Sequence, residues 1–154
     1  MAAKDIAPTG DVPVVTQENG EVVAGFAVGV EPITDVPLIV FGDHTCVFKY
    51  VDFPFVRGAD GTQLLKLPSS DFDLKFMTHY LAGSDIPKAN SYERHMKYLK
   101  KMRIAVPPLE EQRKAVKKIE KLEAKIAEAE AELSRSASKK AAILDKYLSM
   151  RDMK

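Results

Sequence analysis

Asp43, His44 and Cys46 are the residues of this 154-residue chain whose types and spacing come closest to those of a catalytic site. They would supply a candidate base and a candidate nucleophile. No nucleophile elbow, HExxH helix or glycine-rich phosphate loop contains them or the other histidines, His79 and His95. His79 falls in a predicted helix and Cys46 alternates with apolar residues. Packing therefore explains both more simply than catalysis by this chain alone.

A second group with chemical potential is the basic stretch 92–103, YERHMKYLKKMR. Five of its residues are lysine or arginine, and Glu93 is its only acid. Cations interleaved with Tyr92 and Tyr98 suit contacts with nucleic-acid phosphates, and Arg94 could also bond a guanine edge bidentately. The alternative is a solvated charged face, because spacing alone does not show whether these side chains point one way.

The third candidate is the polar turn Asp43-His44-Thr45, which lies between two apolar segments. A loop tip on a rigid sheet is a common place for recognition residues. A tight turn whose polar groups are satisfied internally is the alternative interpretation.

Composition limits the function classes further. Cys46 is the only cysteine, which excludes an internal disulfide and a cysteine-rich zinc site. No cationic, apolar leader opens the chain and no apolar run approaches membrane-spanning length, so we expect a cytoplasmic protein without a membrane partner. The net charge is +1, but residues 1–60 are acidic and residues 61–103 are basic. A nucleic-acid binder of this kind would use a local patch, and an acidic DNA mimic is excluded.

The elements that must position these residues are mostly strands, followed by helices. Alternation and turn signals predict a hairpin around Asn19-Gly20. They predict strands at 38–41, 46–51, 53–56 and 63–67. A helix capped by Ser69, Ser70 or Asp71 should end at Gly83, and Arg103–Val106 should form a short strand. The predicted fold is α+β: a small mixed domain over residues 1–106, followed by a long helix in residues 107–154.

The long helix needs a partner for its apolar face. Residues 107–148 contain no glycine, and their prolines are the opening pair. About 40 residues at about 1.5 Å each give a rod of about 60 Å. A heptad seam runs along it, with lysines on one flank and glutamates on the other, which predicts a coiled coil. The predicted interface residues are Ile119, Leu122, Ile126, Ala129, Leu133, Ile143 and Tyr147. The alternative is a solvated helix that caps its own domain.

Several blocks of the sequence resemble the target-recognition domain of type I restriction-modification specificity (S) subunits. The blocks are PVVTQENG, LIVFGDHTCVFKYVDFPFVRGADGTQLLK and YERHMKYLKKMRIAVPPLEEQRKAVKKIEKL, and the resemblance covers residues 11–148. A full member of that family carries two recognition domains and two long helices, whereas this chain has one of each. The resemblance therefore implies a half-length subunit that homodimerises through an antiparallel pair of helices. The short lead before the PV strand departs from the family pattern. Either the domain is compact, or the chain is a truncated or engineered piece.

The resemblance implies a non-catalytic subunit that binds one half of a bipartite double-stranded DNA target. The implied partners are a DNA methyltransferase subunit and a restriction subunit. S-adenosylmethionine is expected on the methyltransferase, with no cofactor or metal on this chain. The implied DNA-facing residues are Gln17, Asn19, His44, Thr45, Lys49 and Tyr50, and the implied phosphate or base contacts are Arg94, His95, Lys97, Lys100 and Lys101.

Two other functions remain open on the sequence alone. One is a coiled-coil scaffold, or a remnant half-subunit, that assembles with or modulates a complete specificity subunit without binding DNA usefully itself. The other is a stand-alone enzyme that uses Asp43 and His44. DNA retardation by the purified chain separates the first from the DNA-binding function, and activity without a partner would be needed for the second.

Overall fold

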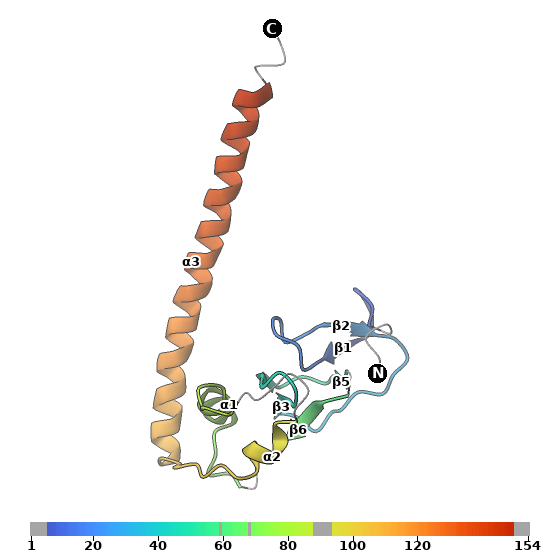
Figure 1. Cartoon of the computed structure of the whole chain (residues 1–154), viewed down its shortest axis with the longest axis vertical. Helices are drawn as coiled ribbons and strands as arrows, with labels where there is room; N and C mark the ends of the chain where they lie inside the picture. The colour runs from blue at the N-terminus through green and yellow to red at the C-terminus, as the bar shows by residue number, and fades with distance from the viewer. Residues whose placement is uncertain (1–5, 59, 68, 88–93, 150–154) are drawn as a thin grey trace. The chain divides into compact units, whose positions relative to one another are not determined.

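The computed structural model of the chain describes residues 6–58, 60–67, 69–87 and 94–149 (Figure 1). It divides into two compact units, Met1–Arg113 and Lys114–Lys154. The first unit holds two small sheets and two short helices, and the second holds most of one long helix. The α+β fold class predicted from the sequence is confirmed.

The first sheet has the strand order β2-β1-β5. Its strands are β1 (Val12–Val15), β2 (Gly25–Ala27) and β5 (Val56–Arg57). β1 runs antiparallel to β2, which confirms the predicted hairpin, and parallel to β5. The strands pair Val14 with Gly25, so the connection between them is much longer than the Asn19-Gly20 dipeptide expected to close it.

The second sheet contains the most deeply buried strand of the described chain. Its order is β4-β3-β6, with β3 (Leu38–Gly42) antiparallel to both β4 (Phe48–Val51) and β6 (Thr62–Leu65). All five residues of β3 are buried. Leu38 and Val40 pack with Val15, Val51 and Phe55 on one face. The alternate side chain, Ile39, packs with residues of helix α1 on the other, as the two-residue period of a strand requires.

Helix α1 (Leu74–Ala82) covers this second face through Met77 and Leu81. It ends at Gly83, as predicted, but its N-cap is Asp73 and not one of residues 69–71. The Asp73 carboxylate accepts a 3.0 Å hydrogen bond from the Phe76 amide, so it satisfies one of the free N–H groups of the first turn.

The chain then passes through a short helix, α2 (Met96–Leu99), into an irregular segment. Arg103–Val106 was expected to form a strand, and that expectation was wrong, since this segment joins no sheet. No helix among the described residues is long and apolar enough to cross a membrane.

Helix α3 (Leu109–Ser149) is 41 residues long, which corresponds to about 60 Å. The proline pair lies immediately before the helix. The Pro108 carbonyl accepts hydrogen bonds from the Glu111 and Gln112 amides of the first turn. Gln112 is completely buried. Its Oε1 accepts from the Asp73 amide and its Nε2 donates to the carbonyls of Asp71 and Pro107, each at 2.8 Å. The first turn of α3 therefore belongs to the compact unit that extends to Arg113.

Candidate nucleic-acid interface

Asp43 holds the end of β3 to the start of α2. Its amide donates to the Gly61 carbonyl at 2.8 Å, and its carboxylate accepts from the Met96 amide at 2.7 Å. The Asp43 carbonyl accepts from both the amide and the ring Nδ1 of His95, at 2.9 and 2.8 Å. Only 2% of Asp43 is exposed. Because it accepts from the first amide of α2, the Asp43 carboxylate fixes the start of that helix.

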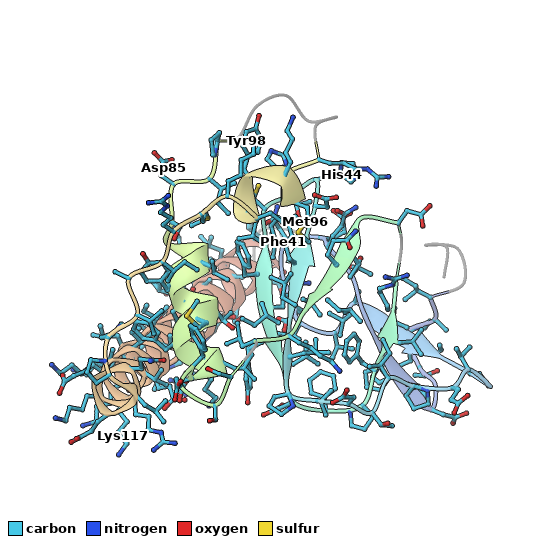
Figure 2. All side chains as sticks on the ribbon, turned by 90° about the horizontal axis from the view of Figure 1, so that it is seen from below. Phe41, His44, Asp85, Met96, Tyr98 and Lys117 are labelled. Carbon is cyan, nitrogen blue, oxygen red and sulfur yellow. The ribbon has the colours of Figure 1, made fainter. Side chains whose placement is uncertain are left out.

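Gln17 connects two further loops to this turn. Its Nε2 donates to the Asp60 carbonyl at 3.1 Å, and its Oε1 accepts from the His44 amide at 3.3 Å. The Thr45 hydroxyl in turn donates to the Gln17 carbonyl at 2.6 Å. Four segments that are distant in sequence (16–20, 42–46, 60–61 and 94–96) thus meet at one end of the second sheet. Figure 2 shows His44 and Met96 at this end.

The DNA-facing set predicted from the resemblance divides into buried and exposed members. Gln17, Lys49 and His95 are buried, and His44, Thr45 and Tyr50 are half-buried. Asn19 is exposed, next to Gly20. Gln17, Lys49 and His95 have polar atoms bonded inside the domain, where they hold its loops in place. The assignment of the whole set to DNA contacts stays a prediction.

His95 is the most enclosed of these side chains, at 2% exposure. Because its Nδ1 faces a carbonyl oxygen, which only accepts, Nδ1 carries the proton. Its Nε2 is buried and has no hydrogen-bond partner among the described residues. His95 therefore anchors α2 to the Gly42–Thr45 turn.

Lys49 and Tyr50 are neighbours on β4 with different surroundings. The Lys49 ammonium donates to the Glu21 carbonyl at 2.8 Å. Burial lowers the pKa of Lys49, and the charge of Glu18 opposes that effect. Burial raises the pKa of Tyr50, and Asp52 adds to the rise. The Lys75 ammonium lies 5.6 Å from the centre of the Tyr50 ring and acts the other way on that pKa.

Exposed cations gather on and around α2. Arg94, Lys97, Lys100 and Lys101 are exposed within eight residues of sequence, and the Lys97 ammonium lies 4.9 Å from the centre of the Tyr98 ring. Tyr92 and Glu93, which open the predicted basic stretch, lie outside the described residues. The hydrogen bonds of Asp43 with His95 and Met96 hold this cluster of cations next to the Gly42–Thr45 turn.

The sequence interpretation missed Arg57, Asp60 and Gln63. Together with Arg94, Gly61 and Thr62 they line a polar cavity of about 290 Å³. Arg57 and Asp60 fall between the expected strands 53–56 and 63–67, and Gln63 opens the second of these strands. The signal available in the sequence was an arginine and an aspartate on either side of Gly58, close before a strand.

The predicted interface residues of α3 present apolar surface on the single chain. Leu122, Ile126, Leu133, Ile143 and Tyr147 are each between 56% and 70% exposed. Ala129 is exposed and Ile119 is half-buried. These exposed fractions describe one copy of the chain.

Comparison with known families gives one match. A family model described as "Type I restriction modification DNA specificity domain" matches residues 1–135, which include the whole globular unit and the first part of α3 beyond it. No curated protein and no solved structure matches the chain.

Proposed function

The chain belongs to the type I restriction modification DNA specificity domain family, and on this premise we propose that it is the subunit through which a restriction-modification complex recognises its DNA target. The family supplies sequence recognition and works in complexes with methyltransferase and restriction subunits. The finer proposal is that each chain binds one half of a bipartite target and directs those partners to it. S-adenosylmethionine would then be bound by the methyltransferase.

The observation that carries this proposal is the family match, which extends over nearly the whole chain. The position of the exposed cations supports it. Arg94, Lys100 and Lys101 flank α2, whose start is fixed by the Asp43 carboxylate. Cations on a rigid backbone suit phosphate contacts, which set the orientation of a protein on the duplex. The neighbouring loops would then face base edges.

We further propose that two copies pair through α3 in an antiparallel arrangement, which would bring two recognition domains to one target. The exposed side chains at heptad spacing support this. Leu122, Ile126 and Leu133 are each more than half exposed on the single chain. Burying a leucine or isoleucine stabilises an assembly by about 1.5–3 kcal/mol per side chain.

The test is to map methylated sites in cells that carry this chain together with a methyltransferase subunit. A bipartite, palindromic motif is expected, because identical recognition domains related by two-fold symmetry read identical half-sites. Methylation at an asymmetric motif would contradict the symmetric pairing. A lack of methylation at any fixed motif, with the complex assembled, would contradict recognition by this chain.

A second candidate is a scaffold that assembles through α3 and does not bind DNA usefully itself. The observation that favours it is the burial of Gln17, Lys49 and His95, three of the side chains assigned to DNA by resemblance. Gel retardation of duplex DNA, with and without the methyltransferase subunit, separates the two candidates. The absence of a shift in both conditions would favour the scaffold.

A further inference from the structure

The polar cavity of about 290 Å³ beside the Gly42–Thr45 turn has walls from two parts of the chain. Arg57, Asp60 and Gln63 come from the β5–β6 connection and its flanks, and Arg94 comes from the approach to α2. Two guanidinium groups, one carboxylate and one amide are thereby available in a single small cavity. Its lining is more polar than the linings of the cavities around Leu144, Tyr50 and Pro107.

The backbone around the cavity is held in place. The amide of Gly58, next to Arg57, donates to the Val15 carbonyl at 2.9 Å. The Thr62 hydroxyl is buried and donates to the Gly58 carbonyl at 2.6 Å, which closes the turn. The Asp60 carbonyl accepts a hydrogen bond from Gln17. His95, the residue after Arg94, donates its amide hydrogen to the Asp43 carbonyl. A site whose backbone is already ordered pays little conformational entropy on binding.

The charged groups of the cavity are available to a ligand. Arg57, Asp60 and Arg94 are all exposed, and the described part of the chain holds no ion pair that involves any of them. The two guanidiniums offer donors in a fixed fork, and the carboxylate offers acceptors. The cavity therefore presents donors and an acceptor side by side.

We propose that this cavity reads one guanine–cytosine base pair in the major groove, an inference that rests on the proposed DNA-recognition function. Guanine presents O6 and N7, which are the preferred acceptors for an arginine, and cytosine presents the N4 amino group, which suits a carboxylate. A phosphate offers only acceptors and is negatively charged, so the Asp60 carboxylate would repel it. An adenine–thymine pair would instead suit Gln63, without a role for two arginines.

The test uses the full chain in complex with its methyltransferase subunit and recovers bound sequences from a pool of randomised duplexes. The variants are Arg57→Ala, Arg94→Ala and Asp60→Asn, with Arg103→Ala as the control, since Arg103 is exposed but lies outside the cavity. The wild-type half-site should contain a G·C pair. We expect each arginine variant to lose preference at that pair by roughly tenfold or more. Arg103→Ala should keep the preference, and Asp60→Asn should weaken discrimination of the cytosine.

Three outcomes would overturn the inference, and each has a distinct signature. If the arginine variants bind all sequences more weakly with an unchanged consensus and a smaller salt dependence, the arginines contact phosphate. If the position affected is an A·T pair, Gln63 is the reader. If the wild-type complex selects no sequence, the proposed function fails together with this inference. A melting curve for each variant shows that it is folded.

Discussion

Gly61 lies at a close approach between the loops of the candidate interface. Its φ of +94° lies in the region that favours glycine, and a Cβ there would lie 2.7 Å from His44 Cδ2 and 2.8 Å from Gln17 Oε1. We expect Gly61→Ala to destabilise the domain by about 2–3 kcal/mol, from backbone strain and displaced side chains together. Gly29→Ala is the matched control, because Gly29 has φ +68° but no atom within 4 Å of the added Cβ. Thermal unfolding that gives equal losses for both variants would show that crowding at Gly61 is unimportant.

The buried ammonium of Lys49 gives the domain a dependence on pH at alkaline values. Because burial lowers its native pKa below 10.5, the unfolded state binds more protons between the native pKa and 10.5. The free energy of unfolding should therefore rise with pH across that window. Tyr50 acts in the opposite sense above pH 10.0, because its native pKa is raised.

Denaturant unfolding in a Tyr50→Phe background isolates the contribution of Lys49. We expect stability to rise with pH in this variant and the rise to vanish when Lys49→Met is added. Equal slopes with and without Lys49 would contradict the assignment to that ammonium.

Lys100 and Lys101 are the exposed cations best placed to test phosphate contact. Replacing both with alanine should weaken binding to all sequences alike and reduce the slope of log affinity against log salt by roughly 2, since each phosphate contact contributes about 0.9. The control is Lys66→Ala, which removes an exposed lysine that is paired with Asp35. A double variant with an unchanged salt slope would place these lysines outside the interface.

The direction of polar side chains is the part of the site that the sequence does not determine. The resemblance marked Gln17, Thr45 and His95 as candidate DNA contacts. Their partners are supplied by tertiary contacts: the Thr45–Gln17 bond spans 28 residues and the His95–Asp43 bond spans 52. Sequence pattern reports polarity, but burial depends on which distant loops close over a residue. For the same reason, the sequence does not show that Arg57 and Asp60, which lie between two expected strands, line a cavity.

At the scale of the element, local pattern predicts β3, the end of α1 at Gly83 and the long helix. These follow from a short apolar run, a glycine C-cap and the absence of helix breakers. It does not predict the start of α1, because residues 69–73 hold several side chains of N-cap type. Asp73 is the N-cap, and Gln112 accepts from its amide from 39 residues away. The parallel pairing of β1 with β5 is equally non-local.

The exposed apolar residues at heptad spacing on α3 are the basis for predicting a dimer. Ile126→Asp should place an unpaired charge in the helix pair and convert a dimer to a monomer. Ala124→Asp makes the same change of charge on the opposite face of the helix and should leave the dimer intact. Sedimentation equilibrium measures the mass of each form. A dimeric Ile126→Asp variant, or a monomeric wild type, would contradict the proposed seam.

At the scale of the whole molecule, the proposed antiparallel pair makes the length of α3 a determinant of half-site separation. Insertion of one further heptad lengthens the helix by about 10.5 Å and keeps its apolar face in phase. At about 3.4 Å per base pair, the spacer of the recognised motif should lengthen by about 3 base pairs. Methylation mapping with the lengthened chain provides the measurement. An unchanged spacer would show that another part of the complex sets the distance.

The three hydrogen bonds of Gln112 have a consequence for the exchange of parts between related chains. A chimera joined at the proline pair would separate Gln112 from the loop that it holds. The half-buried Asp73 amide would then depend on the residue that the donor helix supplied for its hydrogen bond. A chimera joined after Arg113 would carry Gln112 together with its partners. We therefore expect the proposed recognition module to include the first turn of α3, and a graft onto a foreign helix to keep its stability only when that turn is transferred with it.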